Sequence, residues 1–188
     1  MRGRPLFFMN IFCVDQNPVT AARMLPDRHV TKMVLESAQM LSIVFSDHYW
    51  GIGSVMKVDG TPFLTKKGAF KNHPCTQWAA AKLENCAWLI MHGLGLCDEF
   101  GQRFDQEHGL MNSLFDVKDL FVKATGQPIT IYDQVTDFAR AMPEDLKYDT
   151  TIDDITCYRR YLNTKEWAYY NYLRLPDRRP DWLQPISE

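Results

Sequence analysis

Residues 26–44 read PDRHVTKMVLESAQMLSIV and carry apolar side chains three and four residues apart. This spacing gathers the apolar side chains on one face, which predicts a long amphipathic helix that follows Pro26 and buries that face in a core. The positions on this face are Val30, Met33, Val34, Ser37, Met40, Leu41 and Val44.

Further helices are expected on both sides of this one. Asn17 as the N-cap and Pro18 at the first helical position predict a short helix to about Met24, preceded by Ile11–Val14 as a buried strand or an extended segment. Asn72-His73-Pro74 opens the strongest helical pattern of the chain. Its apolar face comprises Trp78, Leu83, Trp88, Leu89, Leu96 and Phe100, and its middle contains Gly93 and Gly95, which could admit a close neighbouring helix or a ligand.

The remaining segments predict a mainly α, single-domain helical bundle over residues 1–188 with a short N-terminal extended segment. Residues 1–8 are expected to be a non-native or flexible extension. Residues 48–71 predict a long loop, for which covering a substrate is one role, because glycines recur too closely for a helix. The other expected elements are a helix over 110–124, a weaker helix over 132–140, a turn at 142–145, an aromatic-rich helix over 152–173 and an extended tail over 176–188.

Composition excludes several classes of protein. The chain has 188 residues, 46% of them hydrophobic, and a formal net charge of −2, which argues against tight non-specific binding of nucleic acid. No apolar run is long enough to span a bilayer and no signal-peptide cleavage site follows the N-terminus, so we expect a cytoplasmic protein with no membrane partner. Five cysteines without zinc-site spacing predict reduced thiols. Phosphate-loop, dinucleotide and metalloprotease motifs are absent, so we expect no cofactor and no metal.

The first candidate site is on the helix that follows Pro26. His29, Lys32 and Glu36 lie three and seven residues apart, so their side chains share one face, and Arg28 is adjacent. A titratable group, a cation and a carboxylate beside apolar residues are typical of an acid–base or phosphate site. The alternative is a solvated helix edge with one Lys32–Glu36 pair.

A second candidate site follows the helix that begins near residue 74. Asn85, His92 and Glu99 recur every seven residues, and Arg103 lies one turn later. Because buried polar groups are costly unless paired, such a line indicates either a functional site or a solvated polar face.

Two further groups suggest contacts with phosphates or bases. Lys71, Asn72 and His73 precede a helix N-terminus, where anions are favoured, although simple N-capping explains them equally well. Near the C-terminus, aromatic side chains alternate with cations, which is typical of single-strand or flipped-base recognition but also of a helix that packs its rings on the core. The members of this group that we take as candidates are Tyr158, Arg159 and Lys165, with Trp78 as a further stacking candidate.

Four stretches carry a resemblance to known proteins: Asn10-Ile11-Phe12, Asp27 to Glu36, Asn72-His73-Pro74, and Ala141 to Arg159. They resemble a family of small, mostly phage-borne proteins of unassigned function across most of residues 9–182. More distantly, their order is similar to that of pyrimidine-dimer DNA glycosylases of the endonuclease V type. That resemblance implies a small all-helical enzyme that flips a nucleotide and uses an N-terminal amine beside a glutamate.

The resemblance implies specific roles for residues of this chain. Glu36 corresponds best to the glutamate. The amine would belong to Met1, or to Met9 or Asn10 if translation starts later or the end is trimmed. Lys32 could replace it if burial favoured its neutral form. His29, Lys32, His73 and Arg159 would hold phosphates, and Trp78 or Tyr158 would stack on the base.

The leading hypothesis is therefore a phage-type protein that processes nucleic acid or nucleotides, most concretely a DNA glycosylase-like enzyme acting on a modified or damaged base. One alternative is a non-catalytic phage counter-defence protein that uses the same cations to bind a small nucleotide signal or a host protein. Another is a helical interaction module whose polar residues are surface groups. The sequence leaves the oligomeric state open.

Overall fold

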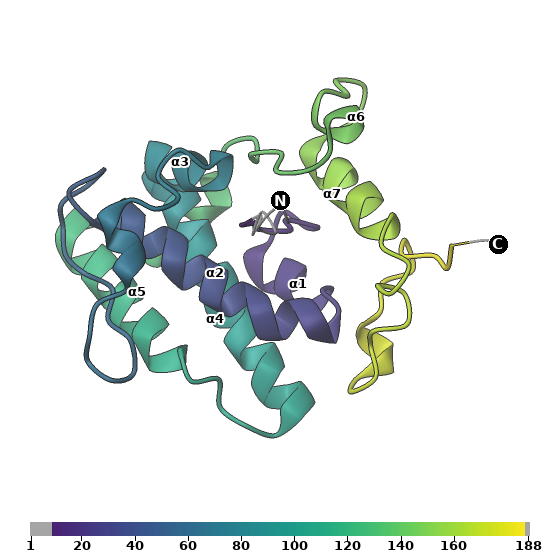
Figure 1. Ribbon diagram of the computed structural model, residues 1–188, viewed down its shortest axis with the longest axis horizontal. Coiled ribbons are helices and arrows are strands. Elements are labelled where there is room, and N and C mark those ends of the chain that lie inside the picture. The colour runs from purple at the N-terminus through teal and green to yellow at the C-terminus, as the bar shows by residue number, and fades with distance from the viewer. Residues whose placement is uncertain (1–8, 187–188) are drawn as a thin grey trace, which may run out of the picture.

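Two long helices, α2 (Asp27–Phe45) and α4 (Leu83–Phe104), cross at the centre of the molecule. The computed structural model describes residues 9–186, and the expected extension at 1–8 lies outside them. The short α1 (Pro18–Arg23) packs on α4, α3 (Pro74–Ala81) packs on both long helices, and α5 (Met111–Thr125) covers α4 (Figure 1). The described residues form no strand, so the predicted mainly α fold is confirmed.

The apolar face expected for residues 26–44 forms the centre of the core. Val30, Val34, Met40, Leu41 and Val44 are fully buried against side chains of the neighbouring helices. The glycines of α4 permit close packing, since a Cβ on Gly95 would lie 3.1 Å from the Ala22 Cβ of α1. They admit neighbouring helices, which was one of the two roles expected for them.

The cap of α2 comes from a distant part of the chain. Pro26 occupies the N-cap position and supplies no side-chain bond, while the Asn171 carbonyl accepts a hydrogen bond from the Asp27 N–H at 2.8 Å. The Asn171 side-chain oxygen accepts a second one from the Arg28 N–H at 2.8 Å. The C-terminal segment therefore satisfies the free N–H groups at the start of α2.

The single helix predicted from residue 74 to Phe100 is wrong, because the structure has two helices separated at Lys82. Lys82 adopts extended dihedral angles, φ −145° and ψ 147°. In a continuous helix the Lys82 N–H would donate to the Trp78 carbonyl. Here the Asn85 side-chain amide donates to that carbonyl instead, at 2.9 Å, so the interruption leaves no unpaired acceptor there.

Three predictions for the C-terminal third are also corrected. The weak helix over 132–140 is replaced by a 3₁₀ turn, η2 (Ile129–Gln134), and an extended segment. The predicted turn at 142–145 leads into the short helix α6 (Glu144–Lys147). The last helix, α7 (Asp154–Asn163), ends ten residues earlier than predicted, and the tail begins with a 3₁₀ turn, η3 (Pro176–Arg178).

The loop expected at residues 48–71 is present and contains one 3₁₀ turn, η1 (Leu64–Lys67), which packs on α2. Its single bridge joins Met56 to Pro62. No helix among the described residues is both long enough and apolar enough to cross a bilayer.

The N-terminal segment, residues 9–16, runs between the α1–α5 helices and α7 (Figure 1). Residues 9–14 are buried and form no strand, and the chain turns at Phe12. Phe12 stacks on Tyr161 of α7 with ring centroids 5.8 Å apart, and the Arg159 Nε donates to the Val14 carbonyl at 2.9 Å. This segment therefore joins α7 to the rest of the fold.

Candidate active site

The carboxylate of Glu36 on α2 is buried beside the N-terminal segment. Its Oε2 accepts a hydrogen bond from the Asn10 N–H at 2.9 Å, and its Oε1 lies 2.8 Å from the Lys32 Nζ. The Glu36 side chain is 8% exposed and that of Lys32 is 50% exposed. Burial raises the pKa of Glu36, and the contacts with Lys32 and Asn10 offset part of this rise. Glu36 is thus protonated more readily than an exposed glutamate.

A tight turn holds Asn10 against Glu36. The Asn10 Oδ1 accepts from the N–H groups of Ile11 and Phe12, at 2.8 and 3.0 Å. Phe12 has φ 43°, in the left-handed region that bulky residues rarely adopt and that must be stabilised by its surroundings. The Asn10 Nδ2 donates to the Ala141 carbonyl at 2.7 Å, which ties the turn to the segment after η2.

His29 lies two turns before Glu36 on the same helix and is enclosed by aromatic rings. Its ring centroid is 4.1 Å from that of Phe12 and 5.1 Å from that of Trp167. Burial, together with the nearby cations Lys165, Lys32 and Arg28, lowers the pKa of His29 to about 3. His29 is therefore neutral near pH 7 and does not provide a positive charge for a phosphate.

The cations around His29 give this side of the molecule a positive surface. The Arg28 guanidinium lies over the Trp167 ring at 5.0 Å, and the Lys165 Nζ lies over the Tyr161 ring at 4.3 Å. The third cation is Lys32, whose charge Glu36 balances. The net charge of −2 thus conceals a local positive region in which phosphates would be favoured.

An apolar pocket of about 330 Å³ opens beside the Asn10 turn. It lies between the start of α3, the segment 140–143 and α7, and Ala141, which accepts the hydrogen bond from Asn10, belongs to its wall. Its wall consists mainly of Pro74, Ala141, Met142, Pro143 and Tyr161, with His73, Arg140 and Lys147 as its polar members. We call it the 141 pocket.

The resemblance named Asn10 only as one possible source of the amine, and the sequence-based candidates did not include the residues at 140–143. A signal for them did exist, since Asn10-Ile11-Phe12 and the stretch from Ala141 are among the residues that carry the family resemblance. Asn10 contacts Glu36 through a hydrogen bond across 26 residues and Ala141 through one across 131 residues, which local patterns do not predict.

The group at residues 71–73 lies at the edge of the 141 pocket. His73 is the N-cap of α3, and its Nδ1 accepts from the Cys75 N–H at 3.2 Å. Partial burial lowers the pKa of His73. Lys71 and Asn72 are exposed. The structure thus matches the capping interpretation for His73 and leaves Lys71 and Asn72 accessible.

The aromatic candidates for base stacking are enclosed by protein. Trp78 packs against Trp88 and Phe138, with ring centroids 5.9 and 5.3 Å away. Tyr158 is fully buried, and its hydroxyl donates to the Ala139 carbonyl at 2.6 Å and accepts from the Ala141 N–H at 3.2 Å. Tyr158 therefore supports the wall of the 141 pocket from behind.

Arg159 is bound to the N-terminal segment. Besides its bond to the Val14 carbonyl, its guanidinium lies over the Trp182 ring at 5.4 Å and 3.7 Å from the Asp15 carboxylate. These contacts hold α7 against the N-terminal segment. They also engage the Arg159 guanidinium, which was predicted from the sequence to contact a phosphate.

The four polar candidates on α4 are buried, and three of them, Asn85, Glu99 and Arg103, are paired within the protein. Asn85 accepts from the N–H and hydroxyl of Thr136, both at 3.0 Å, and His92 stacks on the Trp88 ring. Glu99 lies 3.0 Å from Arg103 and 3.1 Å from Arg178. These four candidates are buried side chains that support the fold, and the structure does not place them beside Glu36.

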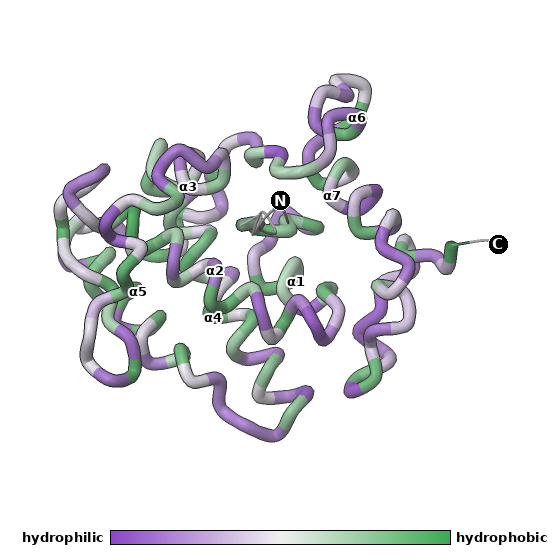
Figure 2. The backbone as a smooth tube through the Cα atoms, in the orientation of Figure 1, coloured by the Kyte–Doolittle hydropathy of each residue, from purple (hydrophilic) through white to green (hydrophobic). Residues whose placement is uncertain are grey.

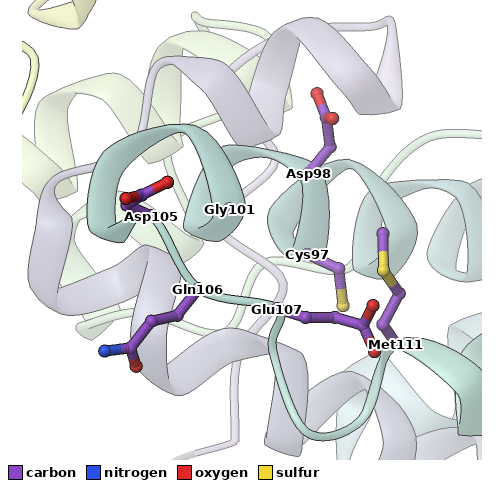
Figure 3. Close-up of a pocket in the computed structure, with 7 residues that line it drawn as sticks. All are labelled: Cys97, Asp98, Gly101, Asp105, Gln106, Glu107 and Met111. Atoms are coloured by element: carbon purple, nitrogen blue, oxygen red, sulfur yellow. The ribbon is translucent and has the colours of Figure 1, made fainter.

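A second pocket, at the link between α4 and α5, has the opposite charge. The link is hydrophilic (Figure 2). The carboxylates of Asp98, Asp105 and Glu107 lie around this pocket, with Cys97 and Met111 on its wall (Figure 3). An acidic lining repels phosphates. The described residues contain no group of three or more His, Cys, Asp or Glu side chains placed to hold a metal ion.

Comparison with known proteins agrees with this geometry. Residues 9–111, more than half of the chain, match the family described as pyrimidine dimer DNA glycosylase. No curated protein and no solved structure matches the chain significantly. The match begins at the residue before Asn10 and includes Glu36 and His73. The chain belongs to the pyrimidine dimer DNA glycosylase family.

Proposed function

We propose that this protein is a DNA glycosylase that releases a damaged pyrimidine base from duplex DNA, with Glu36 as its catalytic carboxylate. The observation that carries the proposal is the buried Glu36 carboxylate, which contacts the nitrogen of Asn10 and the amine of Lys32 beside an apolar pocket. Family membership supports the same reaction class.

The nitrogen of Asn10 is the candidate nucleophile. In a chain that begins at Asn10, this nitrogen would be a primary amine 2.9 Å from the Glu36 carboxylate. The amine nitrogen would form a bond to C1′ of the sugar while the bond from C1′ to the base breaks. The base would leave with the bonding electron pair and take up the proton that the attacking amine loses. Lys32 is the alternative amine, but it is half exposed and forms an ion pair with Glu36.

Glu36 would act twice in this scheme. As a carboxylate it would stabilise the positive charge that develops at C1′ when the base leaves. As an acid, aided by its raised pKa, it would donate a proton to the ring oxygen of the sugar. That oxygen leaves C1′ with its electron pair, and the nitrogen lone pair then forms an iminium bond to C1′.

The 141 pocket would receive the nucleotide that leaves the base stack. Met142, Pro143 and Tyr161 offer apolar and aromatic surface for a base, and His73 and Lys147 offer polar contacts at the edge. Arg28, Lys32, Lys165 and Lys71 would contact the phosphates on either side. The cost of extruding a base is a few kcal/mol and is smallest for damaged bases, which would favour lesions over normal DNA.

Base release, by which we mean cleavage of the bond between C1′ and the base, tests the proposal under single-turnover conditions. Because the cyclobutane ring keeps the cleaved base joined to its neighbour, base release is measured as the abasic sugar that it leaves. The substrates are a duplex with one cyclobutane pyrimidine dimer and the same duplex undamaged. We expect a chain that begins at Asn10 to release base from the damaged duplex only, and a chain with residues before Asn10 to be at least about 100-fold slower, since its nitrogen is an amide.

Lys32→Gln separates the two amines. If Lys32 is the nucleophile, the variant is inactive whichever residue begins the chain, and the longer chain is as active as the shorter one. No base release from the dimer duplex by any form would overturn the proposed function.

A further inference from the structure

Large apolar side chains are exposed on the loop over residues 48–71, away from the 141 pocket. Val58 is 75% exposed, Leu64 is 71% exposed and Met56 is 40% exposed. Three large exposed apolar groups on one short segment indicate a surface that another molecule covers.

The segment that carries them, residues 55–67, has an ordered framework. Val55 and Phe63 are buried, and the Phe63 N–H donates to the Val55 carbonyl at 3.1 Å. At the tip, the Lys57 N–H donates to the Thr61 carbonyl at 2.7 Å, and Asp59 accepts from the Thr61 N–H at 2.9 Å. The exposed apolar groups thus project from a fixed hairpin, which we call the 55–67 hairpin.

The charge of this surface favours a polyanion as its partner. Lys66 and Lys67 line a surface hollow of about 460 Å³ together with His48, and Asp47 is the only acid in its lining. Neither lysine has an ion-pair partner within residues 9–186, whereas Lys57 is paired with Asp59. Exposed apolar side chains on the same segment as two unpaired lysines match a nucleic acid, which presents phosphates beside the faces of its bases.

The hairpin lies close enough to Glu36 to touch the same duplex. The Thr65 hydroxyl is 2.5 Å from that of Ser42 on α2, six residues after Glu36, which is about 9 Å along the helix axis. Ser42 and Glu36 point about 120° apart around the helix axis, so the loop and the site border neighbouring sides of α2, over a length smaller than one turn of duplex DNA.

We propose that the 55–67 hairpin is a second DNA-binding element, whose lysines contact phosphates and whose Val58 and Leu64 enter the minor groove next to the damaged base. Apolar side chains inserted in this way unstack a base step and bend the duplex. The bend would lower the cost of extruding a nucleotide toward Glu36. This inference rests on the proposed function.

The test combines Val58→Ser with Leu64→Ser and measures duplex bending by energy transfer between dyes at the two ends of a dimer-containing duplex. We expect the double variant to bind this duplex at least about tenfold more weakly and to leave it straighter than the wild type does. Val122→Ser, at an exposed position on α5, is the matched control and should change neither quantity.

Lys66→Gln with Lys67→Gln tests the phosphate contacts separately. The logarithm of the affinity falls with the logarithm of salt concentration by about 0.9 for each phosphate contact, so we expect the slope to decrease by about 2. An unchanged slope would overturn the role of these lysines.

The outcomes separate the two proposals. If the wild type bends the damaged duplex and releases base, and both hairpin variants match it, the hairpin proposal fails and the glycosylase proposal stands. If the wild type bends the duplex without releasing base and the hairpin variants bind it more weakly, the glycosylase proposal fails and the hairpin proposal stands. If the wild type binds no duplex, or binds only anionic phosphatidylserine vesicles through the hairpin, the hairpin proposal is overturned.

Discussion

The polar residues of α2 and those of α4 follow the same seven-residue spacing but occupy different surroundings. On α2, His29 and Glu36 lie beside the N-terminal segment, and Glu36 keeps a small exposed fraction next to half-exposed Lys32. On α4, Glu99 and Arg103 are enclosed and bound to each other, and Arg178, Asp27 and backbone carbonyls take up their remaining hydrogen bonds. Spacing alone therefore identifies polar lines on a helix. Which of the two sets of polar residues can act on a substrate depends on their exposure to solvent and on whether their hydrogen-bonding groups are already paired.

The largest expected effect is the loss of base release when Glu36 is replaced by glutamine. The amide keeps an oxygen for the Asn10 N–H but cannot stabilise positive charge at C1′ or donate a proton, so we expect a rate decrease of about 10² to 10⁴. Single-turnover base release gives the rate, and thermal unfolding should show a Tm within a few degrees of the wild type. Unchanged activity would exclude Glu36 as the catalytic carboxylate.

Arg103→Met on α4 should have the opposite pattern of effects: it should lower the free energy of unfolding and leave the rate of base release unchanged. Arg103 donates to the carbonyls of Leu25 and Arg23 at 2.7 and 2.8 Å and pairs with Asp27 and Glu99. Removing one partner of such a buried network costs about 3 to 5 kcal/mol, measurable by urea unfolding.

Lys118→Met removes a surface pair and is the control, with an expected cost below about 1 kcal/mol. A stable Arg103→Met protein with a raised KM would instead show that the α4 line binds substrate.

His92 makes the stability of α4 dependent on pH. Burial lowers its pKa to about 3, from an ordinary value of 6.5, and neither of its ring nitrogens has a partner among the described residues. The unfolded chain therefore binds the proton more tightly, so the contribution of His92 is complete above pH 6.5 and decreases as the pH falls toward 3. At pH 5 the loss is about 2 kcal/mol.

His92→Phe keeps a ring against Trp88 and should reduce the difference between the unfolding free energies at pH 7.5 and pH 5 by about that amount. An unaltered pH dependence would show that His92 has a partner in solution.

The smallest effect is expected for Lys32→Gln. Its contact with Glu36 is partly exposed, so stability should change by less than about 1 kcal/mol. Because Lys32 lowers the pKa of Glu36, its removal should raise that pKa and move the acidic limb of the pH–rate profile of base release to higher pH. A shift to lower pH would contradict the assignment of that limb to Glu36.

The sequence was sufficient for those helices whose signals are local. Apolar periodicity and the Asn17-Pro18 cap predicted α2 and α1 to within about one residue at most ends. The end of α7 was not predictable in this way. Asn163 binds the Trp182 carbonyl at 3.1 Å, and the following segment turns back so that Asn171 caps α2. The break at Lys82 likewise depends on Asn85 and occurs among good helix formers.

The candidate site shows the same division between local and distant information. Helical spacing placed Lys32 and Glu36 on one face, where the structure has them in contact. Spacing could not show that Asn10 closes over Glu36 or that the segment around Ala141 forms a pocket beside it, because both contacts join residues far apart in the chain. It also could not separate buried His29 from an accessible cation.

Trapping of the imine tests the central claim most directly. A chain beginning at Asn10 is incubated with a dimer-containing duplex and sodium borohydride, and the cross-linked peptide is identified by mass spectrometry. The account predicts a cross-link at the Asn10 amine that is lost in Glu36→Gln and retained in Lys32→Gln. A cross-link at another residue, or base release with no cross-link at all, would contradict it.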